Sequence, residues 1–220
     1  MSQMNRDLLS LYLVMGSSNC RGRSPVQVLE AAIRGGITLF QYREKGVRSL
    51  HHTERLMLAM QLRNVCHHHG IPFIVNDDVG LAIQIGADGV HLGQDDGDHA
   101  MIRERVKHMI LGVSTHTVEE ARAAAELGAD YIGVGPIYPT LSKMDAEEAK
   151  GPSILSNIRS SGVTLPMTAI GGINGEVASE LILAGADGIA VVSAIAGAAD
   201  PEAAAKRLKE AVQSAKADLH

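Results

Sequence analysis

The sequence predicts an α/β protein that forms a single (β/α)8 barrel over residues 1–220. Short apolar runs alternate with helical segments along the whole chain. Four of these runs break directly into polar clusters, at residues 41–45, 76–78, 94–96 and 114–116. Three repeats of Gly-Ala-Asp join a helical segment to the next apolar run. Buried parallel strands are continuous apolar runs, and barrels of this kind place their chemistry where the strands end.

The expected strands are short, at residues 11–15, 37–41, 72–75, 88–92, 109–113, 130–134, 165–170 and 187–192. The expected helices fill the intervals, at residues 25–34, 49–68, 78–86, 98–106, 117–126, 152–161, 174–184 and 201–215. Ser24 and Thr117 are predicted N-caps, each followed three residues later by a Gln or Glu that completes a capping box. Asp200 is a predicted N-cap before a proline at the first helical position. An open doubly wound sheet is the alternative, but no Gly-x-Gly-x-x-Gly motif follows the first strand.

The composition disfavours several classes of function. A net charge of -5 and a pI near 6.0 give no basic field, and aromatic residues at 3% leave few rings for stacking bases, so nucleic-acid binding is not expected. No run approaches the roughly 18 apolar residues that span a bilayer, and the first residues do not resemble a signal peptide. Cys20 and Cys66 have neither a disulfide-framework nor a zinc spacing. We therefore expect a cytoplasmic protein without a membrane partner, and a homo-oligomer remains open.

Asp77 and Asp96 follow the third and fourth expected strands, which are neighbours in a barrel. Two carboxylates at one rim repel each other unless a cation lies between them. Mg²⁺ suits such a site, because it takes one or two carboxylates and completes its shell with water and substrate phosphates. The alternative is that both residues are helix N-caps, although Asp78 and Asp95 compete for that role.

Cations and phosphate-binding loops are expected at the same end of the barrel. Arg43 and Lys45 follow the second expected strand, and Lys143 lies in the long segment after the sixth. Together with a metal they would neutralise a diphosphate and help it leave. Gly172 and Ser193 follow the seventh and eighth strands, where barrels often bind phosphate through backbone N–H groups. For any single lysine a solvated loop face is the alternative, and it is the shared position that favours a site.

The ten histidines do not predict a metal centre. The runs at 51–52 and 67–69 fall on the second expected helix, where consecutive residues point in different directions. We expect both runs on the surface. His91 alternates with apolar neighbours in the fourth strand and is predicted to be a hydrogen-bonded core residue.

Seven motifs, in order, resemble the thiamine-phosphate synthase family. They are QYREK at 41–45, FIVNDD at 73–78, GVHLGQDD at 89–96, GVSTH at 112–116, GVGPIYPTLSK at 133–143, AIGGI at 169–173 and VVSAI at 191–195. The resemblance implies a TIM-barrel transferase that joins 4-amino-2-methyl-5-hydroxymethylpyrimidine diphosphate to a thiazole phosphate, whose carboxylated tautomer loses CO₂. The products are thiamine phosphate and diphosphate. In the family the diphosphate is thought to leave first, and the thiazole nitrogen then captures the pyrimidine cation that remains. For such a mechanism the protein has mainly to stabilise charge and to position the substrates.

The resemblance also implies roles for individual residues. The pyrimidine diphosphate would contact Gln41, Arg43, Glu44, Lys45, Asn76, Ser114 and Lys143, among which Arg43, Lys45, Ser114 and Lys143 are the expected catalytic residues. Asp77 and Asp96 would hold Mg²⁺. The thiazole partner would meet Thr140 and Ser142, and its phosphate would meet Gly172, Val192 and Ser193.

Two details of the segment after the sixth strand qualify this assignment. The family usually has threonine at the position of Ser142, and the retained hydroxyl predicts a small loss of packing rather than of binding. Residues 144–150 are polar and free of glycine, as expected of a lid that closes over the substrates.

Three other functions are weighed against the synthase. A thiazole tautomerase is a related barrel that keeps the thiazole-phosphate loops without the whole pyrimidine-diphosphate set, whereas that set is complete here. A non-catalytic regulator that binds thiazole or thiamine phosphate would have no use for two metal-ready carboxylates beside three cations. A sugar-phosphate isomerase or epimerase would need a proton-transferring acid/base pair, and the sequence does not single one out.

Overall fold

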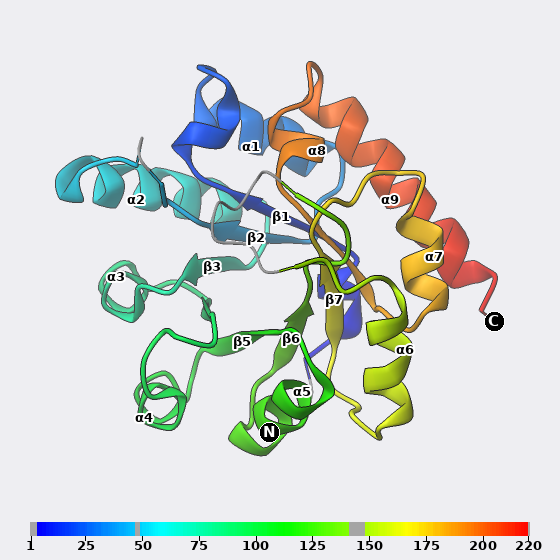
Figure 1. Ribbon diagram of the computed structural model, residues 1–220. Coiled ribbons are helices and arrows are strands. Elements are labelled where there is room, and N and C mark those ends of the chain that lie inside the picture. Colours follow the sequence, from blue (N-terminus) through cyan, green and yellow to red (C-terminus); the bar gives the residue numbers. More distant parts are fainter. Residues whose placement is uncertain (1–3, 47–48, 141–147, 220) are drawn as a thin grey trace.

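Eight short parallel strands close into a barrel in the order of the sequence (Figure 1). The computed structural model describes residues 4–46, 49–140 and 148–219. The strands are β1 (Leu11–Met15), β2 (Leu39–Tyr42), β3 (Phe73–Asn76), β4 (Gly89–Leu92), β5 (Ile110–Thr115), β6 (Tyr131–Val134), β7 (Met167–Ile170) and β8 (Gly188–Val191). Each strand pairs with the next, and β8 pairs with β1. The predicted (β/α)8 barrel is confirmed.

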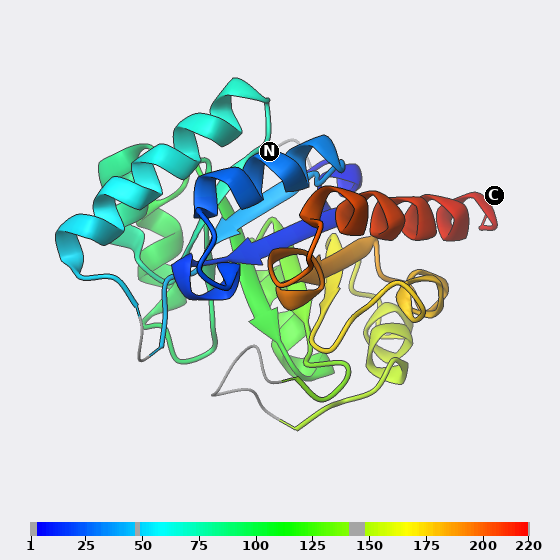
Figure 2. The same cartoon turned by 90° about the horizontal axis from the view of Figure 1, so that it is seen from above.

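The helices surround this barrel on the outside, and Figure 2 shows α1 and α9 side by side. In chain order they are η1 (Arg6–Leu9), η2 (Ser17–Cys20), α1 (Pro25–Arg34), α2 (His52–His68), α3 (Val79–Ile85), α4 (His99–Arg105), α5 (Val118–Leu127), α6 (Ser153–Ser160), α7 (Ala178–Leu183), α8 (Ser193–Ala196) and α9 (Pro201–Ala217). Across the described residues, no helix is both long enough and apolar enough to cross a membrane.

The helix boundaries differ from the sequence prediction in a few places. The sequence predicts no helix at η1, η2 or α8, because four residues are too few to show helical periodicity. The helix expected from residue 174 begins only at Ala178, since the Asn174 side chain accepts a hydrogen bond from the Glu176 N–H and forms a turn. The helix expected from residue 49 begins at His52.

The predicted caps are confirmed in part. Thr117 accepts a hydrogen bond from the Glu120 N–H, and Asp200 accepts one from the Ala203 N–H. The Glu120 carboxylate reaches the His116 N–H at 2.6 Å, one residue before the position that a capping box requires. Ser24 occupies the N-cap position of α1 without a side-chain hydrogen bond, so its predicted capping box is wrong.

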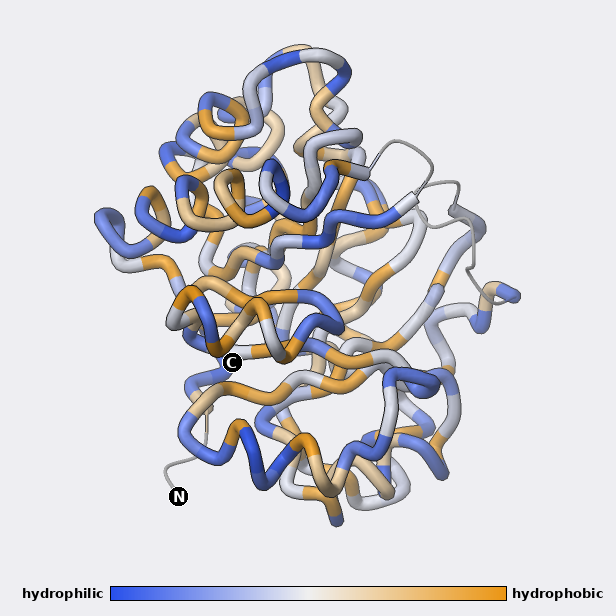
Figure 3. Tube along the Cα trace, turned by 90° about the vertical axis from the view of Figure 1, so that its left-hand side faces the viewer, coloured by the Kyte–Doolittle hydropathy of each residue, from blue (hydrophilic) through white to orange (hydrophobic). Residues whose placement is uncertain are grey.

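Alternate residues of each strand face the barrel interior and the helices. Inward-facing residues, among them Tyr12, Leu39, Ile74 and Tyr131, form a small cluster inside the barrel. The outward-facing residues join the helices in the larger apolar layer around it. The outer helices carry hydrophilic and hydrophobic stretches in alternation (Figure 3), as amphipathic helices do. The strands are therefore buried on both faces, which explains their continuous apolar sequences.

The Gly-Ala-Asp repeats end a helix and fasten the next strand. Gly86 and Gly128 take the left-handed conformation that terminates α3 and α5. The aspartate of each repeat accepts a hydrogen bond from an N–H at the start of the preceding strand, all at 2.8 Å: Asp88 from Phe73, Asp130 from Leu111 and Asp187 from Met167. The sequence predicts the joint but not these bonds, because the partner strand is distant along the chain.

Asp187→Ala should destabilise the fold by about 2–4 kcal/mol, because Asp187 also accepts from Arg6 and Arg159 at 2.7 Å. The partly buried Arg159 guanidinium would then lack a carboxylate partner. Urea denaturation measures this change. Asp7→Ala removes a carboxylate that is 80% exposed and 3.4 Å from Lys216, and serves as the control with little expected effect. Equal effects of the two substitutions would contradict the structural role of Asp187.

Candidate functional site

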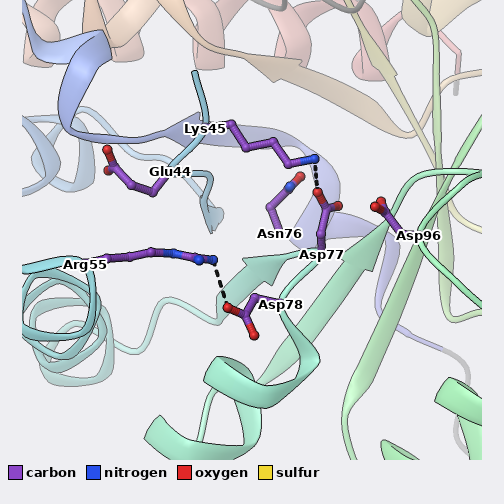
Figure 4. A pocket seen from close by; sticks show the side chains of 7 residues that line it. All are labelled: Glu44, Lys45, Arg55, Asn76, Asp77, Asp78 and Asp96. Atoms are coloured by element: carbon purple, nitrogen blue, oxygen red, sulfur yellow. Dashed lines mark ion pairs between the residues drawn. The ribbon is translucent and has the colours of Figure 1, made fainter. Parts of the chain in front are cut away.

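The polar clusters that follow β2, β3 and β4 meet at the carboxyl ends of these strands. Together with the start of α2 they line a pocket of about 320 Å³ (Figure 4). The lining residues are Glu44, Lys45, Arg55, Asn76, Asp77, Asp78 and Asp96. The predicted convergence of Lys45, Asn76, Asp77 and Asp96 on one mouth is therefore seen in the structure.

Asp77 carries the central charge of this pocket. Its carboxylate forms an ion pair with the Lys45 ammonium and lies within hydrogen-bonding reach of the Asp96 carboxyl (Figure 4). Burial, followed by the contact with Asp96, raises the pKa of Asp77 to about 6, while Lys45 opposes the rise. Two carboxyl groups in contact require a proton or a cation between them. Lys45 supplies only part of the positive charge that the pair needs.

The backbone at Asp77 is strained in a way that the sequence does not reveal. Asp77 has φ 59°, the left-handed region that residues other than glycine rarely occupy. Its N–H donates to the His91 carbonyl at 2.8 Å, and its own carbonyl accepts from the Val79 N–H at 3.0 Å. These bonds hold the turn between β3 and α3 and direct the side chain toward Asp96. Strain of this kind persists mainly at functional sites.

Other aspartates perform the capping that was the alternative role for Asp77 and Asp96. Asp78 caps α3 by accepting from the Leu81 N–H at 2.8 Å. Asp98 caps α4, so the expected competition from Asp95 is wrong. Asp96 instead accepts from the Gly93 N–H at 2.6 Å, which closes its own loop. The N-cap interpretation therefore does not apply to Asp77 or Asp96.

The donor set at Asp77 and Asp96 fits a hard divalent cation. The Oδ2 atom of Asp77 is buried and, beyond its ion pair with Lys45, makes no hydrogen bond in the described part of the chain. Within residues 4–46, 49–140 and 148–219, no group of three or more His, Cys, Asp or Glu side chains is placed to hold a metal ion. Two carboxylates suffice for Mg²⁺, since water and substrate phosphates complete its shell. A soft or transition metal would need more nitrogen or sulfur ligands.

Glu44 has a different environment from the substrate contact that the resemblance implies. Its carboxylate accepts from the Ser17 N–H at 2.8 Å, the Ser17 hydroxyl at 2.6 Å and the Leu50 N–H at 3.1 Å. In Figure 4 it points away from Asp77. Gly16 makes this close packing possible, because a Cβ there would lie 2.2 Å from the Arg43 carbonyl oxygen. Glu44 thus fixes the loop that carries Arg43 and Lys45.

Gln41 and Ser114 lie deeper, at inward-facing positions of β2 and β5. Gln41 is 3% exposed and donates from Nε2 to the Tyr12 hydroxyl at 2.6 Å. The Ser114 hydroxyl lies 2.9 Å from Nε2 of His91, whose Nδ1 lies 3.0 Å from the Tyr131 hydroxyl. The prediction that His91 is a hydrogen-bonded core residue is confirmed.

The expected phosphate loop after β7 lies next to the segment after β6. Gly172 has φ 65°, and a Cβ there would lie 2.7 Å from both the Pro139 carbonyl oxygen and the Tyr138 Cβ. This contact brings the loop after β7 against the segment that ends in Thr140, which is partly buried. Val192 and Ser193 lie at the start of α8, directly after β8.

Part of the predicted site falls outside the described residues. Ser142 and Lys143 lie there, as does most of the expected lid at 144–150. The end of that segment is fastened, since the Lys150 N–H donates to the Pro136 carbonyl at 2.9 Å. The histidine runs at 51–52 and 67–69 are exposed on or beside α2, as predicted.

Comparisons with known proteins identify the family of this chain. The family model described as thiamine monophosphate synthase matches residues 11–195. This chain belongs to that family. The thiamine-phosphate synthase of Geobacillus thermodenitrificans is 56% identical over 97% of this chain and 96% of its own length, and that of Bacillus velezensis is 50% identical over 99% and 96%.

A solved structure supports the same assignment. The thiamine phosphate pyrophosphorylase from Pyrococcus furiosus superposes with a TM-score of 0.85 at 35% identity, covering 96% of this chain and 98% of its own. As a member of the thiamine monophosphate synthase family with such relatives, the chain is an enzyme of the transferase class.

Sequence analysis misses Arg55, which lines the same pocket. Its guanidinium pairs with Asp78 at 3.1 Å, and its Nε is buried without a hydrogen bond in the described part of the chain. Arg55 lies in the first turn of α2, where the helix dipole disfavours a cation. A positively charged residue near the amino end of a helix is the one sequence feature that points to Arg55.

Asp77→Asn should change how stability depends on pH in the metal-free enzyme. The pKa of Asp77 is raised from 3.8 to about 6 in the folded state, so the fold of the wild type favours the protonated carboxyl. The stability that comes from this preference is complete below about pH 4 and is lost as the pH passes 6. Asn tolerates the left-handed backbone and lacks the titration. Between about pH 4 and 7 the variant should therefore gain stability relative to wild type, on the order of 1 kcal/mol for a partly solvated group.

Urea unfolding across this pH range in the presence of a chelator measures the trend. Asp95→Asn removes an exposed carboxylate from the neighbouring loop and controls for the loss of one negative charge. A difference between wild type and Asp77→Asn that stays constant over the whole range would contradict the raised pKa.

Proposed function

We propose that this enzyme is a thiamine-phosphate synthase. It transfers the 4-amino-2-methylpyrimidin-5-ylmethyl group from its diphosphate to a thiazole phosphate, releasing diphosphate, and CO₂ where the thiazole is carboxylated. The observation that carries the proposal is the contact of Asp77 with both Asp96 and Lys45 in one pocket at the carboxyl ends of the strands. A site of carboxylates and cations suits the departure of an anionic leaving group.

Asp77 and Asp96 would hold Mg²⁺, which when bound neutralises charge on the diphosphate. Lys45 balances Asp77 in the free enzyme and reaches the same pocket, so its ammonium is available to a phosphate once the carboxylates have another partner. Arg43 and Lys143 would add positive charge from the ends of β2 and the segment after β6. Asn76 lines the pocket and offers an amide to the same substrate.

The thiazole phosphate would bind on the other side of the mouth. Gly172 lets the backbone come close to an anion, and Val192 and Ser193 present the N–H groups and hydroxyl at the start of α8. Thr140 and Ser142 would face the thiazole ring from the segment after β6. The two substrates thus enter from opposite halves of the barrel and meet above its interior.

The alternatives explain less of this geometry. A thiazole tautomerase or a phosphate-binding regulator needs only the loops after β7 and β8. Neither function accounts for the strained backbone and raised pKa of Asp77 beside Asp96. A sugar-phosphate isomerase needs an acid/base pair poised on a carbon acid, whereas the Lys45 ion pair holds Asp77 in a charge-balancing arrangement.

The cellular setting is part of the proposal. Cys20 and Cys66 are free and buried, and burial raises the pKa of the Cys20 thiol to about 11 and that of Cys66 further. Buried thiols of this kind are unreactive. They suit the reducing cytoplasm, where we propose that the enzyme works. That the enzyme forms a homo-oligomer stays a prediction.

The two-substrate assay tests the function directly. The pyrimidine diphosphate, the thiazole phosphate and Mg²⁺ together should yield thiamine phosphate and one equivalent of diphosphate, and excess chelator should stop the reaction. Omitting either substrate is the control. Release of thiamine phosphate at an unchanged rate in excess chelator would refute the metal role, and no product under any condition would refute the synthase.

Two substitutions should separate the two halves of the site. Asp96→Ala should lower kcat/KM for the pyrimidine diphosphate by about 100-fold or more, because it removes half of the carboxylate pair, and should leave thiazole-phosphate affinity nearly unchanged. Ser193→Ala should weaken thiazole-phosphate binding by about tenfold, the equivalent of one hydrogen bond to a charged group. Isothermal titration and steady-state kinetics measure both effects. Equal losses for both substrates in either variant would count against the assignment.

A further inference from the structure

A line of side-chain hydrogen bonds crosses the barrel interior and ends on two of the proposed substrate-binding residues. Gln41 Nε2 lies 2.6 Å from the Tyr12 hydroxyl, which lies 2.7 Å from the Tyr131 hydroxyl. The line continues at 3.0 Å to Nδ1 of His91 and, from its Nε2, at 2.9 Å to the Ser114 hydroxyl. The five residues come from β2, β1, β6, β4 and β5. It therefore connects two of the proposed substrate-binding residues, on β2 and β5, through the core.

The line is built into the fold rather than formed by chance contacts. Tyr12 and Tyr131 are 1% and 0% exposed, and their rings meet edge to face with centroids 5.9 Å apart. Gly112 leaves the space that the line needs, because a Cβ there would lie 2.2 Å from the Tyr131 ring and 2.5 Å from Nδ1 of His91. In a dry interior a polar network is stable only when its members are paired.

Each tyrosine hydroxyl can donate or accept, so the direction of the bonds follows from the tautomer of His91. The Gln41 Nε2 group donates to the Tyr12 oxygen. When a neutral His91 carries its proton on Nε2, its Nδ1 accepts from Tyr131, and Tyr12 then donates its proton to Tyr131. The Nε2 proton of His91 is donated to the Ser114 oxygen. The Ser114 proton is left to point away from the core.

We infer that Tyr12, Tyr131 and His91 are positioning residues, which orient the Ser114 hydroxyl as a hydrogen-bond donor toward the pyrimidine diphosphate and hold the Gln41 amide against the same substrate. The inference rests on the proposed function of the site. A donor that is already oriented needs no reorganisation when negative charge develops on the departing diphosphate, so it acts mainly in the transition state. Burial raises the pKa of both tyrosines above 10, which keeps their hydroxyl protons in place.

The experiment is a double-mutant cycle of Tyr131→Phe and Ser114→Ala with the pyrimidine diphosphate as the varied substrate. Tyr131→Phe keeps the ring and breaks the line between Tyr12 and His91. It should lower kcat about tenfold with a smaller change in KM, because one oriented hydrogen bond is lost in the transition state. In the Ser114→Ala background the same substitution should lower kcat less than about threefold, because most of its effect passes through Ser114.

Thr168→Val is the matched control. Thr168 lies on β7, two residues from inward-facing Ile170, and its buried hydroxyl has no hydrogen-bond partner in the described part of the chain. Its loss removes an interior hydroxyl without touching the line, so kcat should stay within about twofold of wild type. Thermal unfolding of all variants identifies any loss of activity that follows from loss of folding.

A second measurement reports on the line without turnover. In ¹⁵N NMR spectra of the wild type the His91 ring should carry its proton on Nε2, and Tyr131→Phe should change the tautomer or mix the two forms. A proton on Nδ1 in the wild type would overturn the assigned direction. Equal, multiplicative effects of Tyr131→Phe in both backgrounds would overturn the positioning role, while a wild type that forms no thiamine phosphate would overturn the proposed function itself.

Discussion

The contact between the carboxyl groups of Asp77 and Asp96 is the interaction around which the site is organised. It is unfavourable by itself, because burial and like charge both raise the pKa of Asp77. The barrel enforces it by closing β3 and β4 side by side, and the turn after β3 accepts a left-handed aspartate to aim the side chain. The neighbouring Lys45 supplies partial compensation. A pocket with two carboxyl groups in contact is suited to bind a cation together with an anionic ligand.

Asp77 differs in its hydrogen bonding from the aspartates at the opposite end of the barrel. At the amino ends of the strands, Asp88, Asp130 and Asp187 accept from backbone N–H groups at 2.8 Å, which satisfies each carboxylate within the fold. At the carboxyl ends, the buried Oδ2 atom of Asp77 forms an ion pair with Lys45 and accepts no backbone N–H in the described part of the chain. Satisfied carboxylates hold strands together, whereas an incompletely satisfied one is available to a ligand.

The architecture and the place of the site follow from local sequence patterns. Apolar runs of four to six residues, glycine at helix ends and polar clusters after the strands are short-range features, so the barrel and its active end are predictable. The left-handed Asp77, the role of Arg55 and the saturated hydrogen bonds of Glu44 are not, because each depends on residues that are distant in sequence. The four-residue α8 is too short for any periodic pattern.

The interior of the barrel shows why distant contacts matter for function. Apolar residues such as Leu39 and Ile74 face inward, yet β1 and β6 each place a tyrosine there, and β4 places a histidine between them and Ser114. Each of these polar groups alone would be unfavourable in the core, and each is accommodated because the next one pairs with it. Glycine at position 112 provides the space for that pairing. The core that stabilises the barrel therefore also sets the direction in which a hydroxyl at its mouth can donate.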